Sequence, residues 1–235
     1  PVVIWKGGRT EAGARVIASH TASLATSQSI WNTAIRQAGA VNVANLEELI
    51  DTLKALLYLP PVRGDRVAIA GGSGGQSVAV TDAFTEAGLK IPLFTQKTLD
   101  EFATFLTLIG GSYRNPVDTG NANRAFLDLI MQIVAQDTNI DNLVLLLWPQ
   151  GSPHPRHKRN YRQIQNAISS MTELRQKTPK PLMAILPLFS TPLGIKQTQI
   201  IRQKLQAEGI LAFATAERGA RALKNALEYY QSRVK

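Results

Sequence analysis

The sequence has no cysteine, only three histidines and few aromatic residues among its 235 positions. The absence of cysteine excludes disulfides, thiol nucleophiles and cysteine-ligated zinc, and it fits a cytoplasmic protein. With histidine only at positions 20, 154 and 157, a histidine-rich metal site is not expected. We therefore expect a cytoplasmic protein whose own side chains hold no metal ion.

Long hydrophobic runs are also missing. No window approaches the roughly 18 uninterrupted apolar residues of a membrane-spanning helix, although 44% of the residues are hydrophobic, enough to bury a full core. The sequence begins with Pro-Val-Val-Ile-Trp, which predicts a strand and not the charged start of a signal peptide. Because it starts inside a predicted strand and without methionine, we expect a piece or a processed product of a longer protein, without a membrane partner.

Acidic residues are scarce relative to basic ones. Lysine and arginine number 26 against 17 aspartate and glutamate residues, which gives a formal net charge of +9. Such a charge suits polyanionic partners, either nucleic acid or phosphorylated small molecules. Nucleic acid is the less favoured of the two, because the sequence has no zinc finger, no RNP-like aromatic motif and no alternation of basic and aromatic residues.

The segment Leu59-Pro60-Pro61-Val62-Arg63-Gly64 divides the sequence, because two prolines and a glycine prevent a helix from continuing. We predict a linker at 59–64 between a unit at 1–58 and a unit at 65–235. The first unit is predicted as a strand at 2–5, a glycine-rich loop through residue 26 and two helices. So few elements cannot form an independent domain, and we expect them to be the C-terminal part of a second α/β domain.

The second unit alternates strands with helices. Strands are predicted at 66–70, 91–94, 143–148, 182–186 and 210–213, and the continuous apolar run at 143–148 is typical of a strand buried on both faces. Alternating elements of this kind indicate a parallel sheet covered by helices on both sides. We therefore predict an α/β fold, a flavodoxin-like, doubly wound sheet of five parallel strands.

A glycine-rich turn directly follows the first strand of the second unit. Glycines let backbone N–H groups approach an anion closely, and the next helix points its positive end at the same place. The turn is therefore a candidate phosphate site, but a tight strand-to-helix turn without any ligand explains it equally well. The turn lacks the Walker A lysine and the dinucleotide-binding spacing. Its residues are Gly71, Gly72, Ser73, Gly74, Gly75 and Gln76.

His20 is the candidate catalytic residue of the first unit. It lies between Ser19 and Thr21 in a segment rich in glycine and alanine, which is not how a core histidine is usually surrounded. A neutral imidazole nitrogen is nucleophilic near pH 7 and can accept and pass on a phosphoryl group. A histidine without further context is more often structural, so both interpretations remain open at this point.

A third segment, at 110–118, reads Gly-Gly-Ser-Tyr-Arg-Asn-Pro-Val-Asp, and its Asn115-Pro116 pair predicts a turn. Asp118 would then lie near the carboxyl edge of the sheet, where ligands bind in open α/β folds. An ordinary loop that precedes a helix is slightly favoured on local grounds.

Taken together, these segments resemble the ADP-forming acetyl-CoA synthetases of the succinyl-CoA synthetase superfamily. The resemblance rests on the run Lys-Gly-Gly-Arg-Thr-Glu-Ala-Gly-Ala-Arg at 6–15 and on Ser-His-Thr-Ala-Ser-Leu-Ala at 19–25. It continues in order through Leu-Glu-Glu-Leu at 46–49, the double-proline linker, the glycine turn and Asn-Pro-Val-Asp. It covers essentially the whole sequence.

The resemblance implies that this is the α portion of an NDP-forming acyl-CoA synthetase without its N-terminal CoA-binding domain. Such an enzyme interconverts acyl-CoA, phosphate and ADP with acid, CoA and ATP, and it uses Mg. It implies that His20 is transiently phosphorylated, that the glycine turn faces the phosphate, and that Ser19, Thr21, Asn115 and Asp118 support the site. It further implies that an ATP-grasp subunit or domain completes the enzyme and that the enzyme is an oligomer. This portion alone would not catalyse the full reaction.

Two departures and two alternatives stand beside this interpretation. Ala22 and Thr26 occupy positions where many relatives have glycine, which would stiffen the segment around His20. A non-catalytic, regulatory member of the same superfamily, such as the synthetase-like part of a protein acetyltransferase, is the first alternative. A simple anion-binding flavodoxin-like module is the second.

Overall fold

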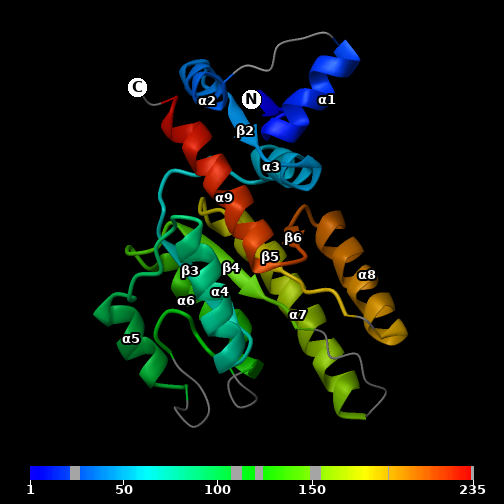
Figure 1. The fold of residues 1–235 in the computed structure, drawn as a ribbon. Coiled ribbons are helices and arrows are strands. Elements are labelled where there is room, and N and C mark those ends of the chain that lie inside the picture. Colours follow the sequence, from blue (N-terminus) through cyan, green and yellow to red (C-terminus); the bar gives the residue numbers. More distant parts are fainter. Residues whose placement is uncertain (22–26, 107–112, 120–123, 149–154, 190, 234–235) are drawn as a thin grey trace.

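The structure, a computed structural model, describes residues 1–21, 27–106, 113–119, 124–148, 155–189 and 191–233 (Figure 1). None of the helices in these ranges has the length and apolar character needed to cross a bilayer. The elements in chain order are β1 (Val3–Trp5), α1 (Glu11–Thr21), α2 (Gln28–Gln37), β2 (Val41–Val43), α3 (Leu46–Tyr58), β3 (Val67–Gly71), α4 (Gly74–Glu86), α5 (Gln96–Ala103), η1 (Arg124–Phe126), α6 (Leu127–Gln136), β4 (Asn142–Leu146), α7 (Pro155–Lys177), β5 (Leu182–Ile185), α8 (Pro192–Ala207), β6 (Leu211–Phe213) and α9 (Ala216–Gln231).

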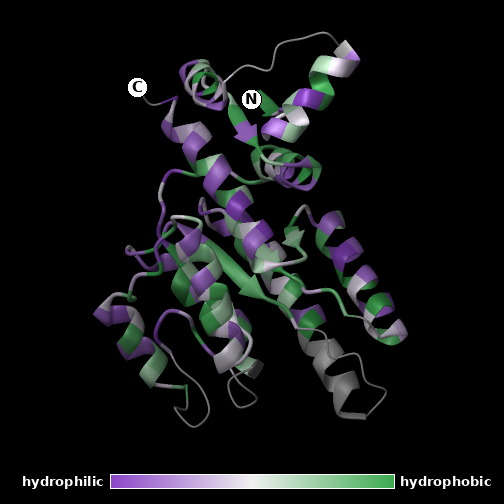
Figure 2. Ribbon diagram, viewed as in Figure 1, coloured by the Kyte–Doolittle hydropathy of each residue, from purple (hydrophilic) through white to green (hydrophobic). Residues whose placement is uncertain are grey.

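The predicted parallel sheet with helices on both faces is confirmed. Among the described residues it has the strand order β3-β4-β5-β6. Side chains alternate between two apolar cores: along β4, Leu143 and Leu145 face α5, α6, α7 and α8, whereas Val144 and Leu146 face α3, α4 and α9. Both sides of each strand are therefore apolar, and Figure 2 shows the hydrophobic colour concentrated in this sheet.

A regular fifth strand is not present in the described residues, and the prediction of one at 91–94 is wrong. Lys90 forms only an isolated parallel bridge to Arg66, just before β3, and Val117 forms one to Ala70 of β3. Between them the side chain of Asn115 takes the place of a strand: its amide oxygen accepts from the N–H of Ile69 at 3.1 Å, and its amide nitrogen donates to a β3 carbonyl at 2.8 Å. The expected strand contains a proline, which has no N–H to donate to a neighbour.

The first unit contains more regular structure than the sequence indicated. β2 pairs in parallel with β1, with Val3 opposite Val41, and this strand was not predicted. The loop expected through residue 26 is wrong for 11–21, which form α1. The hydroxyl of Thr10 accepts from the N–H of Gly13 at 3.1 Å and caps this helix. Residues 22–26 lie outside the described residues.

A buried ion pair joins α3 of the first unit to α9 of the second. The side chain of Asp51 is 5% exposed, and Arg218 donates to both of its oxygens, at 2.6 and 3.1 Å. Arg218 also donates to Glu47 at 2.9 Å. Beside this pair, the amide nitrogen of Asn225 donates to the hydroxyl of Thr52 at 2.9 Å. These bonds satisfy polar groups that would otherwise be costly to bury between two helices.

The apolar core also runs across the predicted boundary between the two units. Ala55 and Leu56 of α3, with Leu59 and Val62 of the predicted linker, belong to the core that α4 and α9 form on the sheet. Val62 is completely buried. The division at 59–64 stays a prediction, and within this chain the segment is packed.

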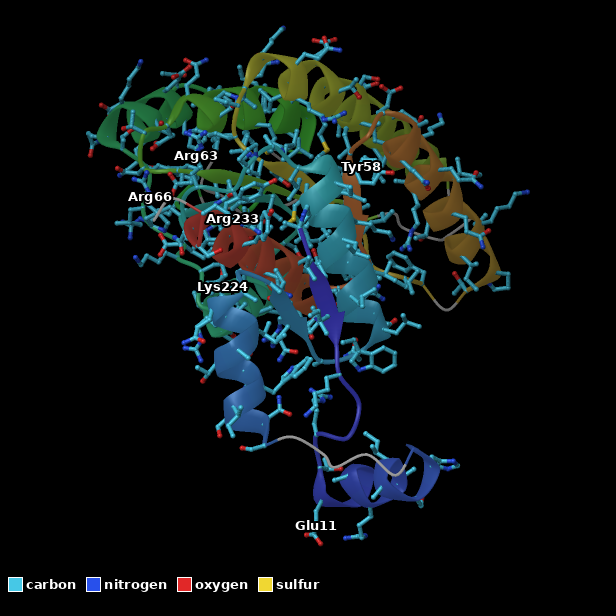
Figure 3. The ribbon with its side chains drawn as sticks, turned by 90° about the horizontal axis from the view of Figure 1, so that it is seen from above. Glu11, Tyr58, Arg63, Arg66, Lys224 and Arg233 are labelled. Carbon is cyan, nitrogen blue, oxygen red and sulfur yellow. The ribbon has the colours of Figure 1, made fainter. Side chains whose placement is uncertain are left out.

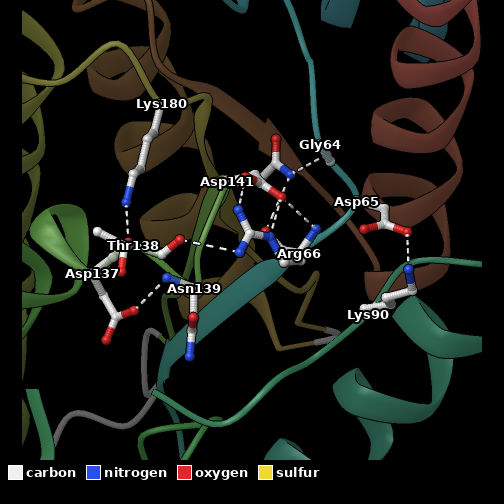
Figure 4. Close-up of polar contacts among 10 residues, drawn as sticks. Gly64, Asp65, Arg66, Lys90, Asp137, Thr138, Asn139, Asp141 and Lys180 are labelled. Carbon is white, nitrogen blue, oxygen red and sulfur yellow. Dashed lines mark hydrogen bonds and ion pairs between the residues drawn. The ribbon is translucent and has the colours of Figure 1, made fainter. Parts of the chain in front are cut away.

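A polar cluster secures the amino edge of the sheet, opposite to the edge where ligands bind (Figure 4). Arg66, just before β3, donates from two side-chain nitrogens to Asp141, just before β4, at 2.9 and 2.7 Å. Burial alone would raise the pKa of the Asp141 carboxyl, but the hydrogen bonds and the charge of Arg66 outweigh burial and lower this pKa below its ordinary value.

Replacing Arg218 by methionine should lower the free energy of unfolding by roughly 3 kcal/mol, because the buried carboxylate of Asp51 would lose its partner. Urea unfolding followed by circular dichroism measures the change. The control is Arg15→Met, which removes an ion pair whose side chains are 69% and 90% exposed and should cost less than about 0.5 kcal/mol. Equal losses in the two variants would contradict a stabilising role for the buried pair.

The Asp141 carboxyl should make stability depend on pH. Because its pKa is lower in the folded chain, its contribution is present above the unfolded pKa of about 4 and is lost as pH falls through the folded value. Asp141→Asn should therefore flatten the fall in unfolding free energy between about pH 5 and 2. Unfolding at a series of pH values tests this, with Glu11→Gln, a 90% exposed carboxylate, as control. An unchanged slope in Asp141→Asn would refute the assignment.

Candidate functional site

The order of the strands locates the ligand-binding edge of the sheet. After β3 the chain passes through α4 to the outer side of β3, and it then returns to form β4 on the other side. In open parallel sheets the crevice at such a reversal, outside the carboxyl ends of the strands, is where ligands bind. The site is therefore expected where β3 and β4 end.

The glycine turn lies at this place, and two of its glycines are required by the backbone. Gly71 and Gly72 have φ angles of +98° and +79°, a conformation that favours glycine. A Cβ atom on Gly71 would come within 2.5 Å of the carbonyl oxygen of Leu146, at the end of β4. The predicted strand-to-helix turn is thus present, and its shape explains both glycines without a ligand.

Within the turn, the groups available to an anion differ from the prediction. The side-chain oxygen of Gln76 accepts from the N–H of Ser73 at 3.0 Å, so Gln76 caps α4. Gly74 and Gly75 are exposed, and N–H groups at the start of a helix have no partner within it. The backbone at Gly74 and Gly75 is therefore the part of the turn best placed to bind a phosphate.

Asp118 lies beside the same helix end, as predicted for the carboxyl edge. Its side chain is largely buried, and its Oδ2 is 3.4 Å from the place where a Cβ atom on Gly74 would stand. A carboxylate at the amino end of a helix is stabilised by the helix dipole. It also repels a second anion there, so a phosphate would meet an acidic neighbour at this turn.

Asn115 holds the edge of the sheet, and a supporting role at the site stays a prediction. Besides its bonds to β3, its amide nitrogen donates to the carbonyl of Pro92 at 2.9 Å. Its polar atoms are thus occupied by the backbone of its own chain, and Asn115 shapes the edge of the sheet.

Three further residues near this edge were not recognised from the sequence. Ser77, in the first turn of α4, is 7% exposed, and its hydroxyl has no hydrogen-bond partner among the described residues. Trp148 and Phe189 follow β4 and β5, with ring centroids 5.6 Å apart and nearly perpendicular planes. In the sequence, only the position of Trp148 at the end of a predicted buried strand could have indicated this pair of aromatic rings.

His20 lies elsewhere in the molecule. It is in the last turn of α1 and is exposed, and the neighbouring Ser19 donates its hydroxyl to the carbonyl of Val16 at 2.8 Å. Figure 1 shows α1 at one end of the molecule and the start of α4 at the other, and Figure 3, turned by 90°, also shows α1 apart from the sheet. The structure does not bring His20 and the glycine turn together. The side chain of Thr21 lies outside the described residues.

No group of three or more His, Asp or Glu side chains in the described ranges is arranged to hold a metal ion. Among the described residues, the polar groups named at the carboxyl edge are backbone amides, the hydroxyl of Ser77 and the carboxylate of Asp118. The amides at the start of a helix can bind and orient a phosphate. His20 lies in another segment, and its role as the nucleophile stays a prediction.

This chain is similar to several CoA ligases. The family described as "Succinyl-CoA ligase like flavodoxin domain" matches residues 1–56. The acetate–CoA ligase (ADP-forming) I subunit alpha of Pyrococcus furiosus is 31% identical over 226 residues, 95% of this chain and 45% of that protein. The 4-hydroxybutyrate–CoA ligase (ADP-forming) of Nitrosopumilus maritimus is 28% identical over 94% of this chain and 29% of its own length.

A solved structure has a similar fold over the entire length of this chain. Acetyl-coenzyme A synthetase 1 of Candidatus Korarchaeum cryptofilum, in complex with phosphate and ADP, superposes with a TM-score of 0.79 at 26% identity. The match covers 100% of this chain and 48% of that one. The chain thus spans less than half the length of these relatives.

Asn115→Ala should lower the free energy of unfolding by about 2–3 kcal/mol, because the buried N–H of Ile69 and the carbonyls of Val67 and Pro92 lose their partner. Phosphate affinity, measured by NMR titration under conditions where the variant is folded, should not change. Asn139→Ala is the matched control: its side chain makes a single exposed bond to the carbonyl of Leu93 at 3.2 Å. A variant with normal stability but weakened phosphate binding would instead assign Asn115 to the ligand site.

Proposed function

Because this chain is a homologue of ADP-forming acetyl-CoA synthetases over almost its whole length, we propose that it is part of an enzyme that interconverts acyl-CoA, phosphate and ADP with acid, CoA and ATP. In this proposal His20 carries the phosphoryl group between the two half-reactions. The observation that carries it is the exposed His20 in the segment matched by the succinyl-CoA ligase family, residues 1–56.

The proposed transfer at His20 is a pair of displacements. Phosphate first displaces CoA from acyl-CoA and gives an acyl phosphate. The imidazole nitrogen of His20 then attacks the phosphorus, so that an N–P bond forms while the P–O bond to the acyl group breaks and the carboxylate leaves. A phosphate oxygen of ADP next attacks the same phosphorus, and the imidazole leaves as ATP forms. Splitting the reaction at a covalent intermediate is the general advantage of a nucleophile.

The packing of α1 supports a carrier role. No residue whose side chain is described in α1 is buried, and Val16 is 56% exposed. A helix with so few buried apolar contacts belongs to the least stably held part of a fold. Since His20 and the glycine turn lie apart, the proposal requires α1 to move, or requires groups of a partner to meet His20 where it is.

The phosphate-binding groups follow from helix polarity. His20 is at the carboxyl end of α1, whose dipole does not favour an anion. The amino end of α4, at Gly74 and Gly75, has the opposite polarity, and its exposed backbone N–H groups and the helix dipole favour phosphate. We propose that this turn binds the phosphate or acyl phosphate. Its neighbour Asp118 keeps the affinity moderate, so that the phosphoryl group can leave.

The remaining parts of the reaction are assigned to other domains. We propose an ATP-grasp subunit or domain that binds ATP or ADP with Mg, and a CoA-binding domain that presents the thioester. ADP and phosphate are present in the complex of the Korarchaeum relative. This chain contributes the phosphoryl carrier and one phosphate-binding turn, and alone it should not catalyse the whole reaction.

The test is phosphate transfer in the longer protein, reconstituted with its ATP-grasp partner. Labelled ATP should place acid-labile, base-stable phosphate on the peptide that contains His20, and added ADP should discharge it. In His20→Ala the label should be absent and synthetase activity should fall at least about 1,000-fold, as when an enzyme loses its nucleophile.

His154→Ala is the matched control and should keep both label and activity. If a folded, ATP-binding partner leaves His20 unlabelled, the catalytic proposal fails. A non-catalytic regulatory or anion-binding module would then be the remaining interpretation.

A further inference from the structure

A groove of about 340 Å³ lies between α3 and α8, on the side of the sheet away from the glycine turn. One wall is formed by Leu53, Leu57 and Tyr58 of α3, and the other by Arg202 of α8. Its floor includes Leu211 and Ala212 of β6. We call it the α3–α8 groove; Figure 3 shows α3, with Tyr58 labelled, running alongside β6.

The floor of the groove is an open sheet edge. Within the described part of the chain, β6 pairs only with β5. The carbonyl of Phe213 accepts from the N–H of Leu186 and so points toward β5. Because backbone groups of successive residues point to opposite sides of a strand, the N–H and C=O of Ala212 point outward into the groove. Such groups are a template for another extended segment.

The α3 wall presents an apolar face that no described residue of this chain covers. Ile50, Leu57 and Tyr58 are 40%, 70% and 51% exposed, although the opposite side of the same helix is buried against α9. Clustered exposed apolar side chains mark surfaces that meet another protein. The α3 wall therefore favours an apolar occupant.

The α8 wall presents a cation. Arg202 lines the groove, and its guanidinium is the side-chain group that pairs best with a carboxylate. Its Nη2 atom has no hydrogen-bond partner among the described residues, so the guanidinium is not fully occupied within the described part of the chain. Lys54 adds a second positive charge at the groove.

The two walls together match one pattern of side chains. α3 covers one face of the sheet and α8 covers the other. Side chains of an added strand alternate between these faces, so apolar side chains would meet Leu53 and Leu57 while intervening carboxylates would meet Arg202. Two copies of this chain would bring like charges together here, because each carries a formal charge of +9. Charge complementarity thus favours an acidic partner.

We propose that the α3–α8 groove binds a partner protein through an extended segment of alternating apolar and acidic residues, which adds to the sheet beside β6. Main-chain bonds to Ala212 provide the docking, and the contacts to Leu57 and Arg202 provide the selectivity. This surface is separate from the glycine turn and from His20, so the proposal does not depend on the proposed reaction.

The test uses a blocked peptide of alternating valine and glutamate as the probe, followed by NMR on the isotope-labelled chain. At millimolar concentrations the peptide should shift the amide signal of Ala212 saturably, and the counterpart with lysine in place of glutamate should not. Arg202→Met should weaken binding about tenfold, as expected for a lost hydrogen bond between charged groups. The substitution removes an unpartnered nitrogen and should not unfold the chain.

The control pair is Leu57→Ser, inside the groove, and Leu93→Ser, outside it; these leucines are 70% and 60% exposed. Only Leu57→Ser should weaken binding. The proposal is overturned if Ala212 shows no saturable shift, or if the lysine peptide binds equally. It is also overturned if hexanoate alone gives the same shifts at the same midpoint, which would indicate a small-carboxylate site. Shifts that depend on protein concentration without peptide would indicate self-association instead.

Discussion

The ion pair between the buried carboxylate of Asp51 and Arg218 is the interaction on which the arrangement of the two units depends. The two oxygens of Asp51 are buried, and Arg218, 167 residues further along the chain, donates to both of them. Together with the apolar core, this pair holds α3 on α9, and β1 and β2 pack against α3. The same orientation directs the second apolar face of α3 toward β6. The ion pair thus helps to place the first unit and to shape the α3–α8 groove.

The two edges of the parallel sheet differ in how their backbone N–H and C=O groups are covered. At β3, the side chain of Asn115 and two single bridges cover the backbone groups of the edge, so β3 is held firmly where the glycine turn begins. At β6, the backbone of Ala212 faces an open groove. An unprotected edge invites pairing with other chains, and proteins usually avoid one. An edge that stays open between an apolar wall and a cationic wall is therefore best explained by a partner that covers it.

The sequence predicted those parts of the fold that depend on local pattern. The strands at 143–148 and 182–186 are apolar on both faces, and the glycines at 71 and 72 are required by the turn, so both were found correctly. α1 was missed because its glycine and alanine content suggested a loop, although Thr10 supplies a helix cap. The side chain of Asn115 bonds to β3 where a fifth strand was predicted, and His20 lies apart from the glycine turn. Both features depend on contacts between distant segments. No local pattern contains that information.

Helix polarity limits what this chain can contribute to the proposed phosphoryl transfer. If His20 carries the phosphoryl group, the carboxyl end of α1 gives that group no electrostatic support, because the dipole there is negative. The amino end of α4 has the opposite polarity but also holds Asp118 beside Gly74, which offsets part of the attraction. We therefore expect neither place to hold a phosphate strongly. A carrier needs this property, because an intermediate bound too tightly would stop the reaction in both directions. The direction of transfer would then be set by the groups that meet His20 in the assembled enzyme.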